Sequence, residues 1–222
     1  MAWQPTTPDV SCAVNLSDVA AVASGATDLP PTGVLWFLYD LVYQGWGFDP
    51  ADAPGFRVLH APNPASLAPR ERPATTPPLR SFAPVPLRPA KGFDLPFYDH
   101  HARAQLRLSD DMIDVYHDAM WSSLHYPKHK MGGWAYPVQN AMEPECALVT
   151  AGLSCGDPQV WRSDEGKRVL ARPDDWTLLF QIDDDENTGM QWVDMGRLYF
   201  WIRAADLRAA VFDRPWVILQ SS

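Results

Sequence analysis

The residues with the clearest chemical potential are four consecutive carboxylates, Asp183, Asp184, Asp185 and Glu186, with Asp194 shortly after them. Ca²⁺ and Mg²⁺ prefer such oxygen ligands, so a metal site would use Asp183, Asp185 and Asp194. The run lacks the alternate ligands and central Gly of an EF-hand. We expect a solvated turn at a strand end, in which one Asp accepts backbone N–H bonds. A patch that faces a protein partner and a metal site are the alternatives.

A second candidate set comprises His125, His129, Cys146 and Cys155. The histidines are spaced for one helical face, but Pro127 lies between them and breaks the helix that a shared zinc ion would need. The cysteines are too far apart for a zinc hook. We therefore expect Cys146 and Cys155 to be small buried residues, close enough for an incidental disulfide under oxidation.

Sequence motifs of catalysis and of cofactor binding are missing. The chain has no G-x-S-x-G elbow, no P-loop and no G-x-G-x-x-G, which argues against ATP and NAD. Cys155 has no base that the sequence places beside it. Adjacent carboxylates on one turn share one environment, so they do not form an acid and base pair. No cofactor is expected.

Tryptophans are abundant, with 10 in the chain. Trp201 and Trp216 lie in apolar runs and should be core residues. Trp134 and Trp192 lie in loops beside Gly and acidic residues, where they either pack a loop onto the core or anchor a partner. The candidate partner-binding residues are therefore Asp183, Asp184, Asp185, Glu186, Trp192, Asp194 and Trp134.

Three apolar runs must position these residues: 178–182, 198–202 and 216–219. Their length and their β-branched and aromatic content predict core strands. The segment 204–210, between the last two runs, is amphipathic and predicts a short helix.

The front of the chain repeats this order. The polar corner after Val14 corresponds to Ile182–Glu186. The aromatic run Gly33–Asp40 corresponds to Gly196–Ile202, and the run Phe56–Leu59 corresponds to Trp216–Leu219. The echo predicts two intertwined units, about 10–60 and about 128–220, that share one core within a single domain of residues 1–222. The acidic corner, residues 183–186, should lie outside that core.

The chain has 22 prolines, and 12 of them lie in residues 50–96. Such density excludes helices and central strands, so we expect a long irregular connection, with edge strands at 56–60 and 81–87 as options. A helix should follow from Ser109 to about Leu124, since acidic residues open it and apolar residues recur at helical spacing. Residues 125–139 predict a loop. The expected fold class is α+β, with mixed, largely antiparallel sheets and few short helices.

The charge balance restricts the partners. The net charge is −9, with 27 acidic against 18 basic side chains, which would repel nucleic acid and anionic membranes. No run of about 18 apolar residues occurs, and the N-terminus has no signal-peptide pattern. The three cysteines suit a reducing compartment. We expect a cytoplasmic protein.

Several blocks together resemble the YwqG-like family, a bacterial group of unassigned function. They are HKMGGWAYPVQNAMEPEC, GLSCGD, LLFQIDDDENTGMQWVDMGRLYFWIRAADL and WVILQ, and the match runs from about Asn15 to the C-terminus. The resemblance implies an internal duplication and a mixed α and β architecture. This chain departs from the family at its front, where a Gly-Gly and Pro segment is missing. Either the first unit is trimmed, or the chain start lies too far downstream.

Two classes of function follow. Some YwqG-like proteins occur beside secreted toxins, which implies an immunity or antitoxin-like role. We expect a non-enzymatic interaction protein that binds a protein partner through an acidic and aromatic face. The alternative is an enzyme, or a metal-dependent binder, with carboxylates in a cleft between the two units.

Overall fold

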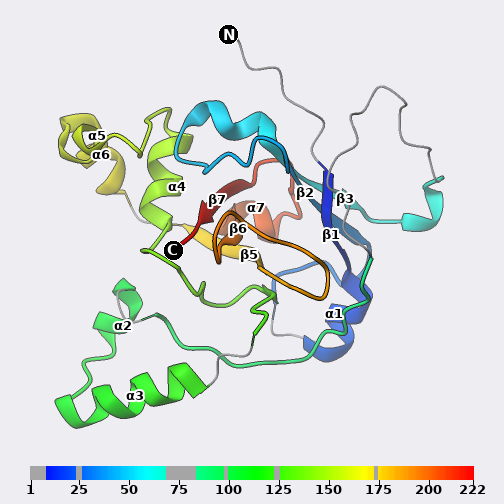
Figure 1. Ribbon diagram of the computed structural model, residues 1–222, viewed down its shortest axis with the longest axis horizontal. Coiled ribbons are helices and arrows are strands. Elements are labelled where there is room, and N and C mark those ends of the chain that lie inside the picture. The colour runs from blue at the N-terminus through cyan, green and yellow to red at the C-terminus, as the bar shows by residue number, and fades with distance from the viewer. Residues whose placement is uncertain (1–8, 24–26, 69–83, 98–99, 123–125, 173–174) are drawn as a thin grey trace.

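The fold consists of two antiparallel sheets and short helices (Figure 1). The computed structural model describes all residues except 1–8, 24–26, 69–83, 98–99, 123–125 and 173–174. One sheet has the order β1-β2-β3 and the other β4-β5-β6-β7. Their strands are β1 (Asp9–Asn15), β2 (Val34–Tyr39), β3 (Phe56–Ala61), β4 (Lys130–Met131), β5 (Trp176–Asp183), β6 (Arg197–Arg203) and β7 (Trp216–Gln220). The predicted α+β class with antiparallel sheets is confirmed.

The helices in the described residues are short. They are α1 (Leu16–Ala23), α2 (His101–Gln105), α3 (Asp110–Ser122), α4 (Glu143–Thr150), α5 (Pro158–Arg162), α6 (Asp164–Leu170) and α7 (Ala204–Arg208), with 3₁₀ turns at Pro50–Gly55 and Pro64–Ser66. The helices predicted near 109–124 and 204–210 are therefore present, as α3 and α7. Among the described helices, none has the length and the apolar character that a membrane crossing requires.

The echoed segments occupy corresponding strands. The segments of the first unit lie at the end of β1, in β2 and in β3, which pair in that order. Their counterparts lie at the end of β5, in β6 and in β7, which also pair in that order. Each set thus forms a three-stranded meander with the same sequence of polar corner and aromatic strand.

Aromatic side chains join the two sheets in one hydrophobic cluster. Phe37 of β2 stacks on Phe180 of β5 at a ring-centroid distance of 4.6 Å and meets Phe200 of β6 edge-on at 5.1 Å. Phe56 of β3 meets Trp216 of β7 at 5.1 Å. Strand β2 buries alternate residues, whereas β7 is buried along its whole length. The second sheet is therefore the centre of the core, and the first sheet covers it.

A loop of the first unit runs along the outer edge of β7. The backbone N–H of Leu219 donates to the carbonyl of Trp46, and the indole N–H of Trp216 donates to the carbonyl of Gly47 at 2.8 Å. Gly47 has φ +77°, and a Cβ placed there would lie 1.8 Å from the carbonyl oxygen of Val217. Only glycine permits this close approach of the loop to the edge strand.

The Pro-rich connection is irregular where it is described. Phe56–Ala61 forms edge strand β3, as predicted for 56–60. Residues 84–87 form no strand, so the option of an edge strand over 81–87 is wrong for them, and 81–83 lie outside the described residues. The prolines remove the backbone donors that a strand would need.

We call residues 100–122, which contain α2 and α3, the arm. Figure 1 shows both helices standing apart from the two sheets. Tyr116 and Met120 are buried on the inner side of α3. The Tyr116 hydroxyl donates to the carbonyl of Pro96 at 2.5 Å, and Trp121 meets the ring of Phe97 at 6.0 Å. The arm therefore rests on the segment that leads into it.

Candidate functional site

The acidic corner after β5 is largely buried. Asp183 is 3% exposed and Asp185 is 6% exposed, so the expectation of a solvated turn outside the core is wrong for these two residues. The reason is the strand register. Asp183 lies directly opposite Arg197 of β6, and a buried carboxylate is tolerated when an opposite charge and hydrogen bonds satisfy it.

Asp183 connects three parts of the chain. One of its oxygens accepts from Arg197 Nε at 2.5 Å, and the other accepts from the Lys128 backbone N–H at 2.8 Å. Arg197 Nη1 donates onward to the carbonyl of Tyr136 at 2.9 Å. Burial disfavours the charged guanidinium, yet Tyr199 and Asp183 together raise the pKa of Arg197. The Asp183 carboxylate is thus part of the internal framework.

Asp185 closes the turn that follows. It accepts the Asn187 backbone N–H at 2.9 Å, which is the predicted Asx-turn, and its other oxygen lies 3.3 Å from His129 Nε2. Burial opposes ionisation of Asp185, but hydrogen bonds from Asn187 and His129 outweigh it and lower its pKa. His129 Nδ1 accepts from the Asp183 backbone N–H at 3.2 Å, so both ring nitrogens are engaged. A zinc ion shared with the cysteines is therefore unsupported, and His125 lies outside the described residues.

Trp192 is a core residue rather than a surface anchor. Its side chain has 0% exposure, and its indole N–H donates to the carbonyl of Asp183 at 3.1 Å. Its backbone N–H donates to the half-buried carboxylate of Asp184 at 2.6 Å, whose pKa is raised mainly by burial. The ring packs edge-on against Tyr39 of the first sheet at 5.8 Å. The tryptophan thus fastens its loop to the core.

Only part of the predicted partner-binding set reaches the surface. Glu186 and Asp194 are exposed, and Trp134 is 37% exposed with its ring 4.8 Å from that of His100. Within the part of the chain that the structure describes, no group of three His, Cys, Asp or Glu side chains is placed to hold a metal ion. The sequence run therefore does not form a converging carboxylate site.

Two buried glutamines hold the loop 128–140 against the central sheet. Gln181 of β5 accepts the Tyr136 N–H at 3.0 Å and donates to the carbonyl of Lys128 at 2.8 Å. Gln220 of β7 accepts the N–H groups of Val138 and Gln139 at 3.0 and 3.1 Å. The motif that carries the family resemblance is thus fixed by side chains of the central sheet. The sequence patterns had not singled out Gln220.

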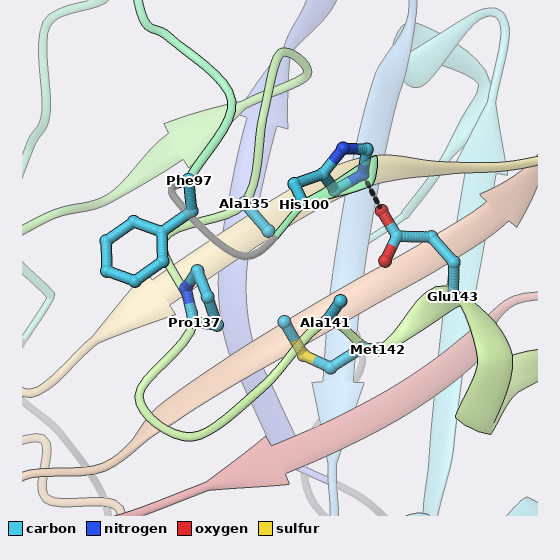
Figure 2. Close-up of a pocket in the computed structure, with 7 residues that line it drawn as sticks. All are labelled: Phe97, His100, Ala135, Pro137, Ala141, Met142 and Glu143. Atoms are coloured by element: carbon cyan, nitrogen blue, oxygen red, sulfur yellow. Dashed lines mark hydrogen bonds and ion pairs between the residues drawn. The ribbon is translucent and has the colours of Figure 1, made fainter. Parts of the chain in front are cut away.

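A small pocket lies where this loop meets α4 and the arm (Figure 2). His100 Nε2 lies 2.8 Å from Glu143 Oε1. The Ala102 N–H donates to His100 Nδ1 at 3.1 Å, so the proton of a neutral ring is on Nε2 and faces the glutamate. The water-accessible volume is about 10 Å³, room for about one water. A histidine without a free lone pair, in so small a space, cannot act as general base on a substrate there.

Burial raises the pKa of two further side chains, Glu145 and Cys155. Burial raises the pKa of Glu145 to about 7, a hydrogen bond from Asn140 opposes this, and Glu143 adds to it. Among the described residues, none forms a hydrogen bond with its Oε2. Burial, reinforced by Glu145, raises the pKa of Cys155 to about 12. Since the thiolate is the nucleophile, the raised pKa keeps Cys155 as a neutral thiol at neutral pH.

The arm carries the second acidic group of the molecule, and this one is exposed. Asp110, Asp111, Asp114 and Asp118 all face solvent on α3. Large apolar side chains are exposed on the same arm: Leu106, Met112, Val115 and Trp121, with Val115 at 69% and Trp121 at 54%. The sequence signal for this surface was the acidic spacing of four residues within α3, with a Trp three residues after the last Asp.

The chain is thus an α+β protein in which a buried ionic and amide network fixes the loop 128–140 to the central sheet, and a mixed acidic and apolar arm stands outside. The chain belongs to the family described as a domain of unknown function (DUF1963), whose model matches residues 10–221. A search of the curated proteins finds no match.

Proposed function

We propose that this chain is a non-enzymatic interaction protein that binds a protein partner through the arm. The observation that carries the proposal is the exposure of Met112, Val115 and Trp121 on a helix that also exposes acidic side chains. Large apolar groups in a polar rim are typical of protein interfaces. Tryptophan in particular is enriched among the residues that dominate binding energy.

The arm supports this function better than the corner after β5. The carboxylates of Asp183 and Asp185 already bind Arg197 and His129 within the fold. A partner could reach them only by unfolding that region. We therefore propose α3, and not the corner predicted from the sequence, as the acidic and aromatic face that binds the partner.

The enzymatic alternative has less support from the geometry. His100, Glu143 and Cys155 are the groups that come closest to catalytic types, and each is engaged or inert as described above. No specific observation favours a reaction at the pocket beside them.

Site-specific photo-crosslinking in the native cells tests the proposal. A photoreactive phenylalanine analogue replaces Val115 on the arm or, as a control, the exposed Glu165 on α6. We expect a discrete protein adduct from position 115 only. The same adducts from both positions, or none from position 115, would refute a role of the arm in binding.

A second measurement then uses the purified partner. Trp121→Ala should weaken binding by about tenfold or more, as expected for an aromatic anchor. Met195→Ala removes an equally accessible apolar side chain far along the chain, at 66% exposure, and should leave the affinity unchanged. Equal losses in both variants would contradict the assignment to the arm.

Three finer statements belong to the same proposal. We propose that the family is the bacterial YwqG-like group, which the ordered motif blocks support. We propose a cytoplasmic location, supported by the sparse cysteines, and an immunity or antitoxin-like role against a basic toxin domain, supported by the acidic charge. Neutralisation of one specific toxin by this chain, lost in Trp121→Ala, would establish that role.

A further inference from the structure

We infer that the partner's binding segment is a basic amphipathic helix that lies along α3. This inference rests on the proposed function and names the chemistry of the partner. It follows from the pattern of charge and apolar surface on α3, from the absence of Lys and Arg within that helix, and from the net charge of the whole chain.

The charges of α3 form a row. Asp110, Asp114 and Asp118 are each four residues apart and all exposed, so they are neighbours on one face. At a rise of about 1.5 Å per residue they recur about every 6 Å. Lysines or arginines at the same spacing on a facing helix meet all three carboxylates.

Apolar side chains border this row. At 100° per residue, Trp121 falls on the same side as the three Asp residues, and Val115 falls on the flank away from the buried Tyr116 and Met120. A partner helix that placed only charges here would leave both apolar side chains in water. A complementary helix therefore carries apolar residues beside its basic ones, in the helix-in-groove mode of recognition.

Other occupants fit less well. A second copy of this chain has the same net charge of −9 and the same Asp row, so two arms facing each other would repel. Nucleic acid and anionic membranes are repelled in the same way. A basic segment of a different protein is the occupant that both the charge and the apolar surface favour.

Binding of designed peptides to the full-length protein tests the inference. A labelled peptide of about 18 residues, which is five helical turns, carries Lys at every fourth position and Leu on the adjoining face. A control peptide has the same composition in scrambled order. We expect fluorescence anisotropy to show binding at least about tenfold tighter for the amphipathic peptide, with affinity falling as salt rises.

Matched variants locate the site. Asp110→Asn, Asp114→Asn and Asp118→Asn together should weaken the amphipathic peptide at least about tenfold and flatten its salt dependence. The control combines Glu165→Gln, Glu186→Gln and Asp213→Asn, three exposed carboxylates outside the arm, and should bind as the wild type does. Trp121→Ala should weaken binding at every salt concentration without changing the slope.

Three outcomes would overturn the inference: no binding of the amphipathic peptide, equal binding of the scrambled peptide, or equal losses in the two triple variants. If any of these occurs while position 115 still crosslinks to one protein in cells, the arm binds a partner of another chemistry and the proposed function stands. If the crosslink also fails, both are refuted.

Discussion

Two regions of the molecule contain four acidic residues each, and they differ in how many of these side chains are buried. In the corner 183–186, Asp183 and Asp185 are buried against Arg197 and His129. On α3, all four Asp residues are exposed, and the helix contains no Lys or Arg. A run of carboxylates in the sequence therefore does not show whether the side chains stabilise the fold or face solvent. The role depends on which positive groups the fold places opposite.

Removing the charge of Asp183 should have the largest effect on the free energy of unfolding. Asp183→Asn leaves Arg197 buried without its counter-ion and should lower the free energy of unfolding by about 3–5 kcal/mol. Asp114→Asn on α3 makes the same chemical change at an exposed site and should alter it by less than about 0.5 kcal/mol. Urea unfolding measures both. Similar values for the two variants would show that the corner is as solvated as the arm.

Glu145 is a third case, because it is buried and has no ion pair with a basic side chain among the described residues. Its folded pKa of about 7 exceeds the value of about 4.3 expected in the unfolded chain. Between these values the folded state holds the extra proton, so this group's stabilisation is full below about pH 4.3 and is lost as the pH rises to about 7. The loss should be about 2–4 kcal/mol.

Glu145→Gln does not titrate and retains an amide oxygen for Asn140, which donates to Glu145 Oε1 at 2.8 Å in the wild type. The difference in the free energy of unfolding, variant minus wild type, should therefore rise between about pH 4.5 and 7 and stay constant at higher pH. Glu165→Gln, exposed on α6, is the control. A variant and a wild type with parallel pH profiles would mean that Glu145 is ionised in the fold.

The inner attachment of the arm should have a smaller effect. Tyr116→Phe removes the hydrogen bond to the carbonyl of Pro96 and should cost about 0.5–1.5 kcal/mol. The loss should appear as faster amide hydrogen exchange in α3, with little change in β5 and β6. Unchanged exchange in α3 would show that this contact does not hold the arm.

Neutralising the exposed row should have the smallest effect on stability. The triple variant Asp110→Asn, Asp114→Asn and Asp118→Asn relieves like-charge pairs spaced four apart but loses a favourable charge in the first helical turn. The two effects oppose each other, so the free energy of unfolding should stay within about 0.5 kcal/mol of the wild type. A larger loss would mean that the row is part of the framework, as the corner is.

The sequence predicted the elements of the fold better than the environment of the site. Apolar runs located β5, β6 and β7, and acidic residues before a helical apolar pattern located α3, because these signals are local. The pair Asp183 and Arg197 depends on the register between β5 and β6, which no local pattern reveals. The same is true of Gln181 and Gln220, whose partners lie in the distant loop 128–140.

The direction of the Trp192 side chain also could not be predicted from the local sequence. Its polar neighbours left two interpretations open, a ring that packs its loop onto the core and a ring that anchors a partner. The chain turns back so tightly that a Cβ on Gly196 would lie 1.9 Å from the carbonyl oxygen of Trp192. That return carries the ring inward onto Tyr39. Loop composition reports the polarity of the neighbours and not the direction in which the backbone turns.

The loop of Trp46 and Gly47 along β7 has a practical consequence. Because it covers the edge strand of the other unit, each half of the chain supplies a surface that the other half needs. A single protease nick in the Pro-rich connection should leave both fragments bound as one particle on a sizing column. The two halves, produced from separate genes, would then be a starting point for a split reporter.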